Sequence, residues 1–184
     1  KCSNGCVDVL RALHYTWICD LLARQLVDRI ESEVDLDLLC PNGIDWVVGS
    51  DHAAASISHA VGTVVGAQHD FTEKQKNPDK QNWNRFEILP EETVLQVEDL
   101  ITTTKTLGLV RQGIREGNPY PVRFTPFVST IVHRSETREF EEWPIVYLVH
   151  YDIETWDGPG VCPLCQEGSK RLRPKHHWVE LNAA

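Results

Sequence analysis

Hydrophobic positions along the chain follow two kinds of spacing. In residues 15–30 apolar side chains recur at intervals of three and four, which predicts an amphipathic helix. Two further helices are expected. One spans residues 53–65, with Ser50 or Asp51 as its cap, and the other spans roughly 104–116. Short apolar runs predict buried strands at 44–49, 67–73, 93–97, 127–132 and 145–151. This alternation favours an α/β fold with a mainly parallel sheet flanked by helices.

Two stretches lack such spacing. Residues 74–84 are polar and contain Pro78, which predicts a loop of the kind that often carries binding residues. The stretch from Asp157 onward is rich in Pro, Gly and charge, and we expect it to be irregular. A length of 184 residues fits one domain, so residues 1–184 are expected to form a single one. The chain starts at Lys1 and has no Met, so its natural start is expected to be missing.

Composition narrows the classes of function. A hydrophobic share of 41% is enough for a sizeable core. The formal net charge of −9 argues against nucleic acid as a partner, because such binders normally show a basic surface. No apolar run approaches the ~18 residues of a membrane span, so no membrane partner is expected. Six cysteines in a chain of this length favour a reducing, cytoplasmic location over a secreted disulfide scaffold.

The strongest chemical signal is an apolar strand that ends in two carboxylates. Residues 93–97 lead into Glu98 and Asp99, and a hydroxyl-rich turn at 102–106 opens the next helix. Ligands of open α/β sheets bind beyond the carboxyl ends of the strands. A helix N-terminus suits a phosphate and the carboxylates suit sugar hydroxyls, so a ribose phosphate fits. An acidic strand end followed by an ordinary threonine cap explains the pattern equally well.

This segment resembles the motif that binds phosphoribosyl pyrophosphate (PRPP) in type I phosphoribosyltransferases. In that family an apolar run precedes two acids, an apolar residue, any residue, Thr-Thr-Gly, a small residue, and Thr or Ser. The match covers residues 94–103 and Thr106. Thr104 departs from the motif because Gly is usual there, and Lys105 departs because a small residue is usual. The resemblance implies the type I phosphoribosyltransferase fold.

The resemblance also implies roles for these residues. Glu98 and Asp99 would hold the ribose hydroxyls, and Asp99 would act in catalysis and contact Mg²⁺ weakly through the substrate. The 5′-phosphate would lie in a cradle made by Thr102, Thr103, Thr104, Lys105 and Thr106. Mg²⁺ is the implied cofactor. It would bind mainly to the substrate phosphates, with few ligands from the protein. Lys105 would either add a cation beside the phosphate or point to solvent.

Nearly the whole chain is similar to one member family, the orotate phosphoribosyltransferases. Residues 48–54 lie where that family binds pyrophosphate, which assigns PRPP binding to Ser50, Asp51, His52 and Ala53. Residues 71–74 resemble a strand end of that family, and its flexible catalytic loop follows there. Lys74 and either Lys76 or Lys80 would neutralise the pyrophosphate as catalytic residues. A solvated loop side chain is the alternative for Lys76 and Lys80, and spacing does not choose between them.

Two further residues would contact the base. Arg134 follows a strand that resembles the family's strand ending in Asp-Arg, with His133 in place of Asp. A guanidinium suits the forked recognition of a carboxylate and a carbonyl, such as those of orotate. An ion pair with Glu136 or Glu139 is the alternative. Lys1 opens a segment that resembles the tail of another family motif, which implies base binding. Family members are usually dimers, so a homodimer is implied.

The run Cys162-Pro163-Leu164-Cys165 resembles the C-terminal part of some bacterial and archaeal orotate enzymes. Cys162 and Cys165 also have the spacing of a zinc pair, and two histidines follow them. One pair is weak evidence, because a structural zinc needs four ligands. Two reduced thiols in a tight turn explain the run as well. Cys2 and Cys6 have no evident role.

The resemblance implies an enzyme of pyrimidine biosynthesis that binds PRPP and orotate and makes orotidine 5′-phosphate and pyrophosphate. Three alternatives stay open. The first is a phosphoribosyltransferase for another base, such as a purine or uracil. The second is a non-catalytic PRPP-binding regulatory module, which the departures at Ser50, Thr104, Lys105 and His133 motivate. The third is a zinc-stabilised interaction domain.

Overall fold

The structure is a computed structural model that describes residues 1–75 and 80–181. The chain divides into two compact units. The larger unit is Val9–Tyr151, and the smaller unit joins both chain ends, Lys1–Asp8 and Asp152–Ala184. That residues 1–184 act as a single domain stays a prediction.

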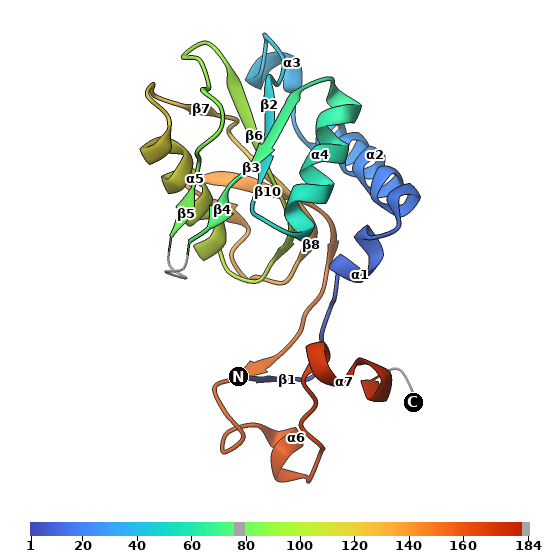
Figure 1. The fold of residues 1–184 in the computed structure, drawn as a ribbon. Helices are drawn as coiled ribbons and strands as arrows, with labels where there is room; N and C mark the ends of the chain where they lie inside the picture. Colours follow the sequence, from blue (N-terminus) through green and yellow to red (C-terminus); the bar gives the residue numbers. More distant parts are fainter. Residues whose placement is uncertain (76–79, 182–184) are drawn as a thin grey trace. The chain divides into compact units, whose positions relative to one another are not determined.

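The larger unit is built on a seven-stranded sheet (Figure 1). Neighbouring strands run in the order β3 (Gln68–Phe71), β2 (Trp46–Gly49), β6 (Thr93–Ile101), β8 (Val128–His133), β10 (Trp143–His150) and β9 (Glu139–Phe140), and β7 (Arg123–Phe124) pairs with β6. Every pair from β3 to β10 is parallel, and β7 is parallel to β6. Only β9 pairs antiparallel within the described sheet. The prediction of a mainly parallel sheet is confirmed.

Helices cover both faces of this sheet. The larger unit contains α1 (Leu10–Leu13), α2 (Thr16–Glu33), α3 (Leu36–Leu39), α4 (Ala53–Val65) and α5 (Lys105–Gly117). Figure 1 shows α2 and α4 together on one side of the sheet and α5 on the other. Alternation along β2 explains the arrangement, because Val48 packs in one core cluster with Val110 of α5. Val47 faces the other way, toward α4, where a Cβ on Gly62 would lie 3.7 Å from its Cβ.

Three local expectations need correction. Helix α4 begins after His52 without a side-chain cap, so the prediction that Ser50 or Asp51 caps it is wrong. Strand β6 does not end at Val97, because pairing with β8 carries it through its two acids to Ile101. The C-terminal stretch is not wholly irregular.

The smaller unit has short elements of its own. Strand β1 (Cys2–Ser3) pairs antiparallel with β11 (Thr155–Trp156). Two short helices follow, α6 (Pro163–Gln166) and α7 (Pro174–Leu181). The elements that the structure describes here are too short to supply a hydrophobic core of the usual kind.

Two short strands lie at the two ends of the predicted loop 74–84 and pair with each other. Strand β4 (Glu73–Lys74) pairs antiparallel with β5 (Gln81–Asn82). Trp83 follows β5 and is buried against Trp46, with 5.8 Å between the ring centroids. Helix α5 packs directly on β5, so the far end of the loop is anchored to the core.

Gly113 lies where α5 meets β5. A Cβ there would overlap the backbone carbonyl of Gln81 and lie 2.8 Å from its carbon atom. We therefore expect Gly113→Ala to destabilise the protein by roughly 1–3 kcal/mol. Gly108 lies in the same helix, and a Cβ there would meet nothing within 4 Å. Gly108→Ala should stabilise the protein by about 0.5–1 kcal/mol, since alanine is the better helix former.

Thermal unfolding of the parent and both variants measures this pair. Melting temperatures that move in opposite directions support the contact between α5 and β5. A Gly113→Ala variant as stable as Gly108→Ala would show that the helix does not press on Gln81.

Candidate functional site

The carboxyl ends of three central strands bring most of the predicted site residues to one edge of the sheet. Strand β2 ends just before Ser50, β6 carries Glu98 and Asp99, and β8 ends just before Arg134. The strands are in parallel register, and the Arg134 amide donates to the Ile101 carbonyl at 2.8 Å. This edge is where open α/β sheets bind ligands.

Glu98 lies beneath this edge, with only 2% of its surface exposed. Its Oε2 accepts a hydrogen bond from the Ser50 hydroxyl at 2.7 Å, and its Oε1 accepts one from the Gln96 amide at 3.3 Å. Burial raises the pKa of Glu98 to about 7, although the Ser50 hydrogen bond acts against this shift. Ser50, expected to bind PRPP, is thus a hydrogen-bond partner of one of the two acids.

A polar network continues from Glu98 to helix α5. The Arg111 Nε donates to the Gln96 Oε1 at 3.3 Å, and its Nη1 donates to the Glu141 Oε2 at 2.5 Å. The Arg111 guanidinium is 4.6 Å from the centre of the Phe124 ring, and burial lowers the pKa of Arg111. The network holds the Glu98 carboxyl in one position at the end of β6.

Neither Gln96 nor Arg111 was predicted from the sequence to belong to the site. A signal was present, because Gln96 interrupts the apolar run 94–97 and Arg111 follows Val110 on the buried side of α5. A polar residue at a core position needs a hydrogen-bond partner, and two such residues are candidates to pair with each other. Sequence spacing alone does not show that they meet.

Asp99 and the turn after β6 are more accessible. Asp99 and Thr104 are half-buried, and the exposed residues are Thr102, Thr103, Lys105 and Thr106. Helix α5 begins at Lys105, and the Thr104 side chain forms no capping hydrogen bond. The alternative of an ordinary threonine cap therefore does not describe this turn. Thr104 has φ −76°, so the turn does not need the conformational freedom of the usual glycine.

The segment after β2 is tightly constrained. Ala53 is buried, Asp51 is half-buried, and the exposed His52 lies 3.7 Å from the Asp51 carboxylate. His52 has φ +62°, a conformation that non-glycine residues adopt at a cost of order 1 kcal/mol. A Cβ on Gly49 would lie 2.8 Å from the Val97 carbonyl oxygen, so β2 needs glycine where it passes β6. Strain next to a ligand-binding edge is typical of functional segments.

The lysines expected to meet pyrophosphate lie on the hairpin. Lys74 is exposed on β4. Lys80 is exposed and pairs with the Glu116 carboxylate at 3.1 Å. Lys76 lies outside the described residues. Lys74 thus forms no ion pair with the residues that the structure describes, while Lys80 must leave Glu116 to contact a ligand.

Arg134 is half-buried, and its Nε is buried without a hydrogen-bond partner among the described residues. The expected alternative, an ion pair with Glu136 or Glu139, is not formed in that part of the chain. A buried donor without a partner costs about 1–3 kcal/mol, more for a charged group. Such a donor is a candidate contact for a ligand acceptor.

His133 fills the position where Asp was expected, and it is fully buried. Its Nε2 lies 3.0 Å from the Thr137 carbonyl oxygen, so Nε2 carries the proton. Its Nδ1 therefore accepts from the Nδ1 of His150, also at 3.0 Å. Burial lowers the pKa of His133, and its ring stacks on Tyr147 with 5.0 Å between centroids. The neutral ring thus packs at the end of β8, directly before Arg134.

The remaining predicted site residues lie in the smaller unit. Lys1, expected to contact the base, is exposed and pairs with Asp157 at 3.6 Å. The sulfur atoms of Cys162 and Cys165 lie close together there, and the sulfur atom of Cys2 lies near both. No pattern in the sequence predicted a role for Cys2, because its neighbours Cys162 and Cys165 are distant along the chain.

The chain is similar to several orotate phosphoribosyltransferases, although no protein-family model matches it. It is 33% identical over 164 residues to the enzyme of Caldicellulosiruptor bescii, covering 89% of this chain and 78% of that protein. It is 30% identical over 174 residues to the enzyme of Caldanaerobacter subterraneus, covering 95% and 84%. The enzyme of Heliobacterium modesticaldum is 29% identical over 172 residues, with 94% and 83% covered.

Solved structures show the same fold. An orotate phosphoribosyltransferase of Mycobacterium tuberculosis in complex with PRPP matches with a TM-score of 0.53 and 20% identity, covering 79% of this chain and 80% of that one. An adenine phosphoribosyltransferase of Thermoanaerobacter pseudethanolicus matches with a TM-score of 0.56 and 10% identity, covering 78% and 87%. The predicted phosphoribosyltransferase fold is confirmed. Among the described helices, none has the length and apolar character to cross a membrane.

The buried carboxyl of Glu98 should make stability depend on pH. Its pKa in the folded chain is about 7, above the ordinary value of 4.5. The folded state therefore binds the proton more tightly, and this contribution is full below pH 4.5 and lost as the pH rises through about 7. Glu98→Gln removes the titration and can keep both hydrogen bonds. Its stability relative to the parent should rise by roughly 2 kcal/mol from about pH 5 to about pH 8.

Chemical denaturation at the two pH values measures the difference. Glu87→Gln, a change at an exposed carboxyl, is the control and should show no such rise. If the difference between Glu98→Gln and the parent is independent of pH, the carboxyl is not held as described.

Proposed function

The chain belongs to the orotate phosphoribosyltransferase family, and we propose that it transfers the 5-phosphoribosyl group of PRPP to orotate. The products would be orotidine 5′-phosphate and pyrophosphate. One observation carries the proposal: two adjacent acids near a strand end, a helix start that Thr104 does not cap, and an arginine Nε buried without a partner among the described residues lie along one sheet edge. These features come from Glu98–Asp99, from residues 102–106 and from Arg134.

The PRPP end of the site would use the edge between β6 and α5. The backbone N–H groups at the start of α5, which the Thr104 side chain does not cap, suit the 5′-phosphate. Asp99 would hold the ribose hydroxyls, and the buried Glu98 would support the adjoining backbone with Ser50. This ordering follows from burial, because the Glu98 oxygens already accept two hydrogen bonds and the Asp99 side chain is the more accessible.

The strand-end carboxylates fit a role for Mg²⁺, although a limited one. Glu98 is a poor ligand for a hard cation because it is buried and its pKa is raised. Asp99 is the more accessible of the two acids, and Mg²⁺ commonly takes one or two carboxylates together with waters and substrate phosphates. When bound, the ion would neutralise charge on the pyrophosphate.

The orotate end of the site would use the β8 edge. The buried Arg134 Nε needs an acceptor, and the orotate carboxylate supplies one with two oxygens. His133 would act through Arg134 rather than on the substrate, since both of its nitrogens are already hydrogen-bonded. The replacement of Asp by His at this position is therefore compatible with base binding.

The chemistry would depend on electrostatics more than on proton transfer. Orotate attacks with a deprotonated N1, so the site must stabilise a positively charged ribosyl group and a departing pyrophosphate. Asp99 would favour the positive charge near the ribose. Lys74 would neutralise negative charge on the departing pyrophosphate. Lys80 would do the same once it has left Glu116. Lys76 stays a candidate for the same role.

Activity tests the proposal directly. Incubation with PRPP, orotate and Mg²⁺ should deplete orotate, measured by its ultraviolet absorbance. Asp99→Asn should lower kcat/KM by roughly 100-fold or more, because it removes charge that stabilises the transition state. The double variant Glu98→Ala/Asp99→Ala should be inactive.

Arg134→Ala should raise KM for orotate by roughly 100-fold, the cost of one charged contact. Its affinity for PRPP, measured by calorimetry, should stay unchanged. Arg24→Ala, at an exposed position on α2, is the control and should behave as the parent. PRPP binding without orotate turnover would instead favour another base or a non-catalytic module. Failure to bind PRPP would show that the interpretation of residues 94–106 is wrong.

We also propose a cytoplasmic homodimer, as the resemblance implies. The first two helices expose several large apolar side chains, which supports a contact with a second copy. These side chains are Leu10, Tyr15, Trp17 and Leu21, each at least 50% exposed.

Trp17→Glu should weaken self-association in sedimentation experiments, because it places a charge on this surface. Leu38→Glu, at a 74% exposed position on α3, is the matched control and should sediment as the parent. Equal sedimentation of all three proteins as dimers would exclude this surface as the contact.

A further inference from the structure

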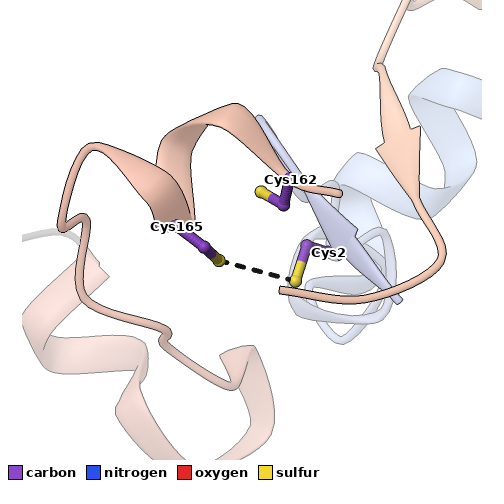
Figure 2. Close-up of side chains that lie close together, drawn as sticks. All are labelled: Cys2, Cys162 and Cys165. Carbon is purple, nitrogen blue, oxygen red and sulfur yellow. Dashed lines mark hydrogen bonds between the residues drawn. The ribbon is translucent and has the colours of Figure 1, made fainter. Parts of the chain in front are cut away.

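Three cysteine thiols from the two chain ends lie together in the smaller unit (Figure 2). Cys2 belongs to β1, Cys162 directly precedes α6, and Cys165 lies within α6. Their sulfur atoms all lie within 4.8 Å of one another, and 3.8 Å separates the sulfurs of Cys2 and Cys165. All three are free thiols, and 3.8 Å is far above the ~2.05 Å of a disulfide.

These distances match a tetrahedral metal centre. Thiolate sulfurs bind zinc at ~2.3 Å, so two of them on a tetrahedral ion lie about 3.8 Å apart. We propose that Cys2, Cys162 and Cys165 bind one structural zinc ion as thiolates. Structural zinc usually has four protein ligands, and no other described Cys, His, Asp or Glu joins the cluster, so a solvent molecule would complete the set. Zinc replaces the three thiol protons, which pass to solvent, and no oxidation is involved.

The local fold is suited to holding these three ligands. The pairing of β1 with β11 places Cys2 opposite Trp156, and the Asn4 amide donates to the Glu154 carbonyl at 3.3 Å. Proline at the first position of α6 starts the helix directly after Cys162, so Cys165 lies one turn further on the same side. The ligands are therefore positioned by backbone pairing and by one helical turn.

Soft thiolate ligands favour zinc over Mg²⁺ or Ca²⁺, which prefer oxygen.

The smaller unit needs such a link because it has almost no core. It contains roughly 40 residues from two distant parts of the chain. Cys162 is its only buried residue among those that the structure describes. Chains of about this size usually need a metal, disulfides or association to fold, since too little apolar surface is buried. A zinc ion would join the first residues to the last and stabilise the unit.

Metal analysis of the full chain, purified without chelators, tests the site. We expect about one equivalent of zinc in the parent protein, since structural sites bind tightly. Cys2→Ser and Cys165→Ser should each lose most of it. Cys6→Ser is the matched control, since Cys6 is an exposed cysteine of the same unit outside the cluster, and it should keep the zinc.

Cobalt gives a second measurement that does not depend on how the protein was purified. Protein stripped of metal and reloaded with Co²⁺ should show sulfur-to-cobalt charge-transfer absorption. Its intensity per bound cobalt ion should fall by about one third in Cys2→Ser, because one of three thiolates is lost.

Three results would overturn the proposal. The first is less than about a tenth of an equivalent of zinc after refolding with the ion. The second is a disulfide between Cys2 and Cys165 in the purified protein, shown by peptide mass spectrometry. The third is equal loss of zinc in Cys6→Ser and Cys2→Ser, which would exclude this set of three ligands. None of these measurements depends on orotate turnover.

Discussion

The parallel pairing of β6 with β2 on one side and β8 on the other is the constraint on which the site depends. It places residues in or just after the carboxyl-terminal parts of three strands at one edge, although Ser50, Glu98 and Arg134 are far apart in the sequence. Strands β2 and β6 approach each other closely at Gly49, because its Cα faces the Val97 carbonyl with no room for a side chain. A shift of register would separate Glu98 and Asp99 from Arg134.

A buried polar network gives that edge its electrostatic character. Glu98 is taken out of water by the sheet, and Ser50 and Gln96 provide its hydrogen bonds. Gln96 is held in turn by Arg111, which pairs with Glu141. Such a network fixes one geometry because each member left unpaired would incur the cost of burial. Of the two adjacent acids, Asp99 is consequently the more accessible to a ligand.

The departures from the family motif have local explanations. The turn at Thr104 has an ordinary backbone conformation, so glycine is not required there. His133 satisfies both ring nitrogens within the fold and packs at the strand end before Arg134. The smaller unit follows a different principle, because Cys162 is its only buried residue among those described. Its stability must come from cross-linking or backbone pairing more than from apolar burial.

The sequence by itself determined the α/β class, the parallel sheet, the bounds of α4 and the pair of acids next to the apolar run of a central strand, because these depend on local spacing of apolar and polar residues. It did not determine that β6 continues through Glu98 to Ile101, since that extension depends on pairing with β8. Nor did it reveal the partners Gln96 and Arg111, or the meeting of Cys2 with Cys162. These contacts join residues distant along the chain, and only the tertiary structure decides which distant residues are neighbours.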